Sequence, residues 1–309
     1  MRASDSNHLL NDSFNISTEV ANAMEAKRPI VALESTVIAH GLPRPLNLKT
    51  AERMEEIVRE GRATPATIAV LEGKLCIGLN RVQLAYIAEH DQIRKISIRD
   101  LPIAIAEKAD GATTVAATIW IAHRSGIEVF ATGGIGGVHR GVLPDISADL
   151  PQLERTPIVV VCSGAKVVLD LPGTREWLET HGITVAGYGS EDFPAFYSRR
   201  SGLKVDVQCN SPAAVAKLVA TQRKLGLNTA LLVTVPVPSA AEIPQDQLSV
   251  LVEGALNCAK HEGVSGREIT PFLLSAMAAD SSGATLRANV ALLENNARVA
   301  ASVAHALLS

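Results

Sequence analysis

The chain has 309 residues, of which 47% are hydrophobic and 3% aromatic, and its formal net charge is −3 at pH 7. This balance, with no Lys/Arg-rich block, disfavours a nucleic-acid-binding protein, and no apolar run approaches the roughly 20 residues that span a bilayer. The four cysteines are far apart, so they favour neither a zinc site nor a disulfide framework. We expect a cytoplasmic protein with no nucleic-acid or membrane partner.

The beginning of the chain is polar and has no sustained hydrophobic segment, so we expect neither a secretory signal nor a membrane anchor there. We predict a flexible tail over residues 1–25. Residues 26–309 contain no low-complexity linker and no internal repeat, which predicts one large domain.

Short apolar runs alternate with amphipathic stretches along this domain. That alternation is typical of strands alternating with helices, and of a mainly parallel sheet covered on both faces. The predicted fold class is therefore α/β, with three α/β/α layers and a mainly parallel central sheet. In chain order, the first predicted elements are a strand at PIVALEST, a helix ending at Gly61, a hairpin at TIAVLEGKLCIGL that turns at Glu72-Gly73, and a helix at RVQLAYIAE.

Further along, a strand is predicted near Ile96 to Ile98 and a helix of small residues over GATTVAATIWIAHRSG. The strand EVF then enters the glycine-rich loop ATGGIGGVHRG, and TPIVVVCSGAKVVLDLPGTREWLETHG predicts a strand, a turn and a helix. Two more strands are expected at ITVAGYGS and NTALLVTVPVP. Helical periodicity follows near 211–226, 245–262 and 285–307.

Three polar features follow predicted strands, at the edge where open α/β sheets bind ligands. Glu34 ends the first strand, the glycine-rich loop follows EVF, and Lys166 follows IVVVCSG. An ammonium buried without a partner tends to lose its proton, and a neutral lysine is a nucleophile. Each feature also has a structural alternative: a lysine that extends to solvent, a solvent-facing carboxylate and a tight turn.

The glycines of the loop would let backbone amides approach an anion closely. The loop does not match a dinucleotide-binding fingerprint, because PDISADL follows it instead of a helix. A phosphate- or sugar-binding loop is therefore favoured over an NAD site. In PDISADL, Asp145 and Asp149 share a face if the segment is helical, and they could hold a hydrated divalent cation or simply be solvated.

A lysine amine, carboxylates and an anion-binding loop together suit Schiff-base chemistry on a phosphorylated sugar. A serine hydrolase is disfavoured because Ser163 stands in V-C-S-G-A and not in G-x-S-x-G.

Several blocks match one known family in order, from about Pro29 to about Val303: VALESTVIAHGLPRP, ATIAVLEGKLCIGL, RDLP, GATTVAAT, FATGGIGGVHRG, DISADL, VVCSGAK, YGSEDFPAFYSR, TPFLL and NNA. The chain resembles pseudouridine-5'-phosphate glycosidase (pseudouridylate synthase), also described as the indigoidine synthase A-like family. The resemblance implies a lyase of the carbon-oxygen, hydro-lyase type. Its reaction would be reversible cleavage of the carbon-carbon glycosidic bond of pseudouridine 5'-phosphate to uracil and ribose 5-phosphate, in pseudouridine catabolism.

The resemblance also implies roles for individual residues. By match, Lys166 forms the covalent sugar adduct, Glu34 is the proton donor, Asp149 is a second acid or base, and Asp145 is associated with Mn²⁺. The implied substrate contacts are Lys95, Val115, Thr132, His139, Ser147, Ala148, Asp149 and Asn289. A homotrimer is implied as well.

Two alternatives stay open. The chain could be a related Schiff-base lyase that acts on another phosphosugar. It could also be a catalytically silent sugar-phosphate-binding protein, which would predict loss of Glu34, Asp149 or Lys166, and all three are present.

Overall fold

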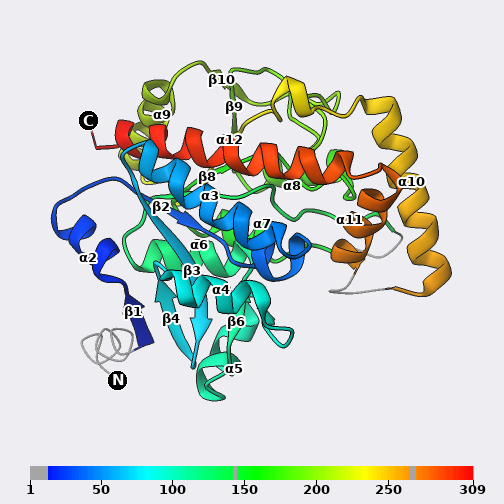
Figure 1. Cartoon of the computed structure of the whole chain (residues 1–309). Helices are drawn as coiled ribbons and strands as arrows, with labels where there is room; N and C mark the ends of the chain where they lie inside the picture. The colour runs from blue at the N-terminus through cyan, green and yellow to red at the C-terminus, as the bar shows by residue number, and fades with distance from the viewer. Residues whose placement is uncertain (1–12, 142–144, 265–268, 309) are drawn as a thin grey trace.

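A single mixed sheet forms the centre of the molecule (Figure 1). The computed structural model describes residues 13–141, 145–264 and 269–308. Among them the strand order is β1-β4-β3-β2-β7-β8-β11-β9-β10, and β6 pairs with β3 and β5 beside this path. The run from β3 to β10 is parallel throughout, whereas β3 pairs antiparallel with β4 and β6.

The described strands are β1 (Phe14–Ile16), β2 (Ile30–Leu33), β3 (Thr64–Leu71), β4 (Lys74–Ile77), β5 (Arg94–Ile96), β6 (Gly111–Thr113), β7 (Val129–Ala131), β8 (Val159–Cys162), β9 (Thr184–Tyr188), β10 (Val207–Cys209) and β11 (Leu231–Thr234). The described α-helices are α2 (Thr18–Glu25), α3 (Leu46–Glu60), α4 (Arg81–Glu89), α5 (Leu101–Ala106), α6 (Val115–Arg124), α7 (Asp149–Glu154), α8 (Leu171–Thr180), α9 (Pro212–Lys224), α10 (Gln245–Glu262), α11 (Ile269–Asp280) and α12 (Ala284–Ala306).

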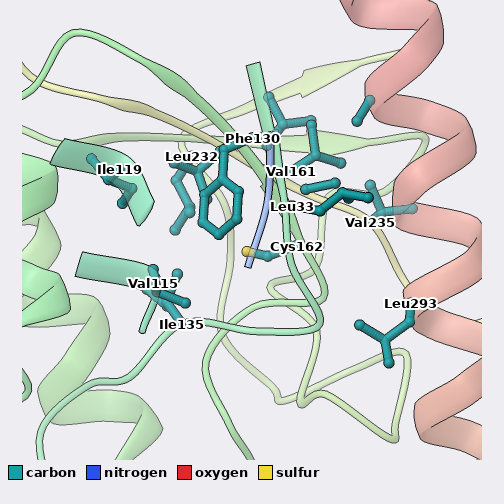
Figure 2. Packing of buried hydrophobic residues seen from close by; sticks show 14 of the residues in the cluster. Leu33, Val115, Ile119, Phe130, Ile135, Val161, Cys162, Leu232, Val235 and Leu293 are labelled. Atoms are coloured by element: carbon teal, nitrogen blue, oxygen red, sulfur yellow. The ribbon is translucent and has the colours of Figure 1, made fainter. Parts of the chain in front are cut away.

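Helices cover both faces of the sheet, as the predicted α/β/α class requires. The long helix α12 packs on β2, β7 and β8 with α3 and α9 beside it, and α6 packs on β2 and β3 from the other face. Figure 2 shows Val115 and Ile119 of α6 on one side of the strands and Leu293 of α12 on the other. Strands buried on both faces need continuous apolar runs, and burying each large side chain stabilises the fold by about 1.5–3 kcal/mol.

Several local predictions are confirmed. The helix α3 is followed by its C-cap residue Gly61, and the hairpin of β3 and β4 turns through Glu72 and Gly73, both with positive φ. Within the described ranges, none of the helices has the length and apolar character needed to cross a membrane.

The prediction of a flexible tail over residues 1–25 is wrong for residues 14–25. The strand β1 pairs with β4, the hydroxyl of Ser17 caps α2, and Val20 and Ala23 are fully buried. Two apolar residues three apart are enough to bury one face of a short helix, so the folded domain begins before residue 26. Residues 1–12 lie outside the described residues.

Other boundaries also differ from the prediction. The strand expected near residues 96–98 ends at Ile96, and the segment 111–126 begins with β6 before Thr114 caps α6. The helix predicted after the strand IVVVCSG is α8, which starts only at Leu171. Lys166 therefore lies in an irregular turn between β8 and α8. The segment from Asp145 is not helical until Asp149, so these two carboxylates do not share a helix face.

Candidate active site

A pocket of about 420 Å³ lies at the carboxyl ends of β2, β7 and β8, where the sequence predicted it. We call it the polar pocket. Its lining includes Glu34 after β2, Gly136 and His139 after β7, Lys166 after β8, Lys95 of β5, and the segment 145–149 before α7. The parallel order of the strands brings these distant segments to one edge of the sheet.

Glu34 forms part of the buried floor of this pocket, with 7% of its surface exposed. The Thr132 hydroxyl, at the end of β7, donates a hydrogen bond to Oε1 of Glu34. Burial raises the pKa of the Glu34 carboxyl above its ordinary value, while the charge of Lys166 and the Thr132 hydrogen bond lower it by less. A carboxyl in this setting can hold its proton and act as a general acid.

Asp149 is the second floor carboxylate, and it is 6% exposed. Its Oδ1 accepts a hydrogen bond from the backbone N of Ala116, at the start of α6, at 2.9 Å. Its Oδ2 accepts from the backbone N of Gly136 at 2.7 Å. Two backbone donors from separate elements therefore fix the orientation of the carboxylate, as a preorganised proton-transfer group requires.

Several amides of the glycine-rich loop donate hydrogen bonds within the protein. Besides Gly136, the amide of Ile135 donates to the carbonyl of Gly164 at 3.0 Å and the amide of Val138 donates to the hydroxyl of Thr174 at 2.9 Å. A Cβ on Gly136 would lie 2.2 Å from the Ser147 hydroxyl oxygen. The amides of Ile135, Gly136 and Val138 are therefore not available to an anion, and the close approach at Gly136 brings Ser147 and Asp149 into position. An anion-binding role for the other glycines of the loop stays a prediction.

Lys166 sits in a turn that is locked to this loop. Its backbone N donates to the carbonyl of Ile135 at 3.0 Å, and Gly164, two residues earlier, has φ of +81°. A Cβ there would lie 2.4 Å from the carbonyl oxygen of Pro194, so only glycine fits. The lysine is half-buried, and within the described part of the chain its amine has no hydrogen bond or ion pair.

A second, smaller cavity adjoins the polar pocket. We call it the apolar cavity, because Val37, Phe196, Pro271 and Leu274 form much of its wall. Glu34, Lys95 and Lys166 line both spaces. The acid and the amine therefore stand at the boundary between a polar and an apolar compartment.

The predicted site residues divide into three groups. The polar pocket is lined by Glu34, Lys95, Val115, His139, Asp145, Ser147, Ala148, Asp149 and Lys166. Asn289 lines the apolar cavity instead. Thr132 is 1% exposed and lines neither space, so its contact is with the Glu34 carboxyl and not with a substrate.

Some residues of the site were missed by the sequence prediction. Arg99 and Thr270 line the polar pocket, and Asn296 lies fully buried behind it. The Asn296 amide donates to the Thr132 carbonyl at 2.9 Å and to the Ser163 hydroxyl at 3.1 Å, so α12 ties together the ends of β7 and β8. A sequence signal existed, because Asn296 stands seven residues after Asn289 and therefore shares its helix face.

The donor groups of the pocket bear on the implied Mn²⁺ site. Among residues 13–141, 145–264 and 269–308 there is no group of three or more His, Cys, Asp or Glu side chains that could hold a metal ion. Both oxygens of Asp149 already accept hydrogen bonds, whereas Asp145 is exposed and lines the pocket. This donor set fits a cation held by one carboxylate, with water and substrate oxygens as its other ligands.

The fold and this pocket define an α/β enzyme, with a lysine and two buried carboxylates at the ligand-binding edge of a parallel sheet. A family model described as "Indigoidine synthase A like protein" matches residues 19–306, and the chain belongs to this family.

Two curated relatives extend this result, and both carry the name pseudouridine-5'-phosphate glycosidase. The protein from Caldanaerobacter subterraneus subsp. tengcongensis is 47% identical over 297 residues, which cover 96% of this chain and 97% of the relative. The protein from Chloroflexus aurantiacus is 50% identical over 295 residues, which cover 94% of this chain and 97% of the relative.

Two solved structures share the fold. An indigoidine synthase A-like protein from Thermotoga maritima matches with a TM-score of 0.86 and 39% identity, over 91% of this chain and 94% of that chain. The prealnumycin C-glycosynthase AlnA, solved in complex with ribulose 5-phosphate, matches with a TM-score of 0.88 and 37% identity, over 96% and 97%.

Proposed function

We propose that this protein reversibly cleaves the carbon-carbon glycosidic bond of pseudouridine 5'-phosphate and yields uracil and ribose 5-phosphate, as a lyase of pseudouridine catabolism. Relatives of 47% and 50% identity carry the name of this activity. The observation that carries the proposal is the position of Glu34 and Lys166, which line both the polar pocket and the apolar cavity. A bond between a charged sugar phosphate and a flat base would lie across this boundary.

The lining of the two spaces fits this orientation of the substrate. Lys95 and Arg99 give the polar pocket positive charge, which suits the ribose phosphate. Phe196 gives the apolar cavity a flat aromatic wall, Leu274 adds apolar contact, and Asn289 adds an amide that can pair with the polar edge of uracil.

A carbon leaving group requires electrons from a neighbouring nitrogen. In the proposed mechanism the C1'–O4' bond opens, its electron pair goes to O4' with a proton, and the uracil ring supplies electrons as N1 loses its proton. The Lys166 amine then adds to C1', and N1 regains its proton. Glu34 next protonates C5 of the base, the C1'–C5 bond breaks with its electron pair entering the uracil ring, and the lysine nitrogen forms an iminium with C1'.

Asp149 handles the remaining protons. Held by two backbone amides, its carboxylate can accept the N1 proton and pass it to O4' as the ring opens. It can then accept the proton that the Lys166 amine loses on bonding to C1' and return it to N1. Water then hydrolyses the iminium, which frees ribose 5-phosphate and regenerates the amine.

A divalent cation such as Mn²⁺, held by Asp145 through one carboxylate and water, would neutralise part of the phosphate charge at the pocket. Lys95 and Arg99 provide positive charge at the same place without a metal. The cation is therefore assigned to phosphate binding in this proposal, and the protein side chains carry the bond-breaking steps.

The test is to mix the purified full chain with pseudouridine 5'-phosphate, with and without Mn²⁺, and to measure free uracil. Sodium borohydride added during turnover should trap ribose 5-phosphate on Lys166, seen as a mass increase of the peptide that contains it. A chain that releases no uracil and traps no adduct under these conditions is not this enzyme, and would be the catalytically silent binding protein considered above.

A second candidate function is favoured by one specific observation. A structural neighbour over nearly the whole chain is named a C-glycosynthase and was solved with ribulose 5-phosphate. If borohydride traps ribose 5-phosphate on Lys166 while pseudouridine 5'-phosphate stays intact, this chain is a Schiff-base enzyme for another base or acceptor.

A further inference from the structure

Beyond the apolar cavity lies a third space of about 470 Å³, between the π-helix η1 (Val37–Gly41) with the segment after it and the helices α11 and α12. We call it the outer cavity. It shares five lining residues with the apolar cavity: His40, Gly41, Pro271, Leu274 and Asn289. It shares none with the polar pocket. The three spaces therefore follow one another in series, with Glu34 and Lys166 at the first boundary.

The order of bond breaking creates a need for such a space. When the C1'–C5 bond breaks, the free base forms while the five-carbon phosphate is still bonded to Lys166. Under the proposed function that adduct occupies the polar pocket, so a base leaving by the same mouth would have to pass it. In the reverse direction the base has to arrive after the adduct has formed, so it meets the same obstruction.

The walls of the outer cavity suit a small neutral ring. The small side chains of Ala39, Ala278 and Ala279 keep the outer cavity wide, and Leu42 and Leu286 offer apolar contact to a ring. Ser275 and Ala279 are exposed, so the cavity reaches the surface of the molecule. Within the described residues its lining carries no lysine, arginine or carboxylate that would attract a sugar phosphate.

We propose that the outer cavity is the passage by which the free base enters and leaves the active site, separate from the mouth used by the sugar phosphate. This inference rests on the proposed function. Leu274 and Asn289 line both the apolar cavity and the outer cavity, so they lie where the two spaces join. There the Leu274 side chain can contact a face of a pyrimidine, and the Asn289 amide can pair with its polar edge.

The experiment narrows the outer cavity and measures the two substrates separately. In Ala278→Trp, on the cavity wall, the KM for uracil in synthesis from ribose 5-phosphate and uracil should rise about tenfold or more, because entry of the base is hindered. The rate of borohydride-trapped adduct formation from ribose 5-phosphate alone should stay within about twofold of wild type. Ala220→Trp, on the exposed side of α9 and away from the cavities, is the matched control and should change neither rate.

A second variant folds with the passage open, and chemical labelling then blocks the passage in the folded protein. Ala279→Cys is made in a Cys258→Ser background, since the other three cysteines are buried, and is then labelled with a maleimide that carries polyethylene glycol. Labelling should raise the KM for uracil and leave adduct formation unchanged. A labelled protein with the wild-type KM for uracil overturns the passage, and so does one that also loses adduct formation. Failure of the proposed function would look different, because the wild-type chain itself would then form neither adduct nor product.

Discussion

The floor and the mouth of the polar pocket are built in contrasting ways. On the floor, Glu34 and Asp149 are 7% and 6% exposed, and each carboxyl group accepts hydrogen bonds from neighbouring elements. At the mouth, Asp145 is exposed, Ile146 is 42% exposed and the Arg99 side chain is 75% exposed. Charges on the floor act in a low dielectric, whereas those at the mouth are screened by water and salt.

This contrast separates residues that the fold holds in a fixed position from residues that can move. The floor groups are positioned by backbone amides and by strand ends that α12 ties together through Asn296. The mouth groups have freedom to adapt to a charged ligand. Substitutions on the floor should therefore change the rate of the chemical steps, and those at the mouth should change mainly binding.

The largest effect is expected at Lys166. Lys166→Ala removes the amine that bonds to C1', so uracil release should fall by at least about 10³-fold and borohydride should trap no sugar. Lys49→Ala, at an exposed position of α3, is the matched control and should keep wild-type activity. An active Lys166→Ala protein would contradict the covalent mechanism.

The next effect is expected at Glu34. Glu34→Gln removes the proton donor but keeps the shape, so uracil release should fall by about 10²- to 10⁴-fold while adduct formation from ribose 5-phosphate persists. The variant should stay folded. Because burial raises the folded pKa of Glu34 above its unfolded value near 4.5, the contribution of Glu34 to the free energy of unfolding falls as the pH rises above that value, and glutamine removes this contribution. Equal loss of adduct and uracil release would show that Glu34 acts before the carbon-carbon bond breaks.

Much of the fold and of the floor can be predicted from the sequence. Apolar runs that alternate with amphipathic helices give the α/β class, and polar residues directly after such runs give Glu34 and Lys166. The structure brings both to one pocket with Asp149. Their roles are proposals, since position at a strand end does not by itself specify chemistry.

Other features could not be read from local patterns. The helix α11 is apolar on nearly all sides, so it shows little helical periodicity, yet it forms the wall of two cavities. Thr132 was expected to contact substrate, but it points its hydroxyl at Glu34. The expected substrate contact of Asn289 stays a prediction, and Asn289 lines the apolar cavity. Which side of a strand end faces a ligand depends on packing between elements distant in sequence.

A smaller effect on the floor is expected from Thr132→Val. Loss of the hydroxyl removes a hydrogen bond that lowers the pKa of Glu34, so that pKa should rise further. If Glu34 works as an acid, the alkaline limb of the pH profile of kcat should move to higher pH, with kcat itself changed by less than about tenfold. Thr132→Ser keeps the hydroxyl and should keep the profile. A limb that moves to lower pH would mean that Glu34 does not act in its protonated form.

The smallest effect is expected at the mouth, from Asp145→Asn. The exposed carboxylate works in a solvated setting, so kcat at saturating Mn²⁺ should change by no more than about threefold. The Mn²⁺ concentration for half-maximal activity should rise, because an amide oxygen binds a hard cation less strongly than a carboxylate does. Titration of Mn²⁺ against uracil release measures both quantities, and Asp91→Asn, at an exposed position after α4, is the matched control. If Asp145→Asn lowered kcat as far as Glu34→Gln, the mouth would share in the bond-breaking steps, and the contrast between floor and mouth would not hold.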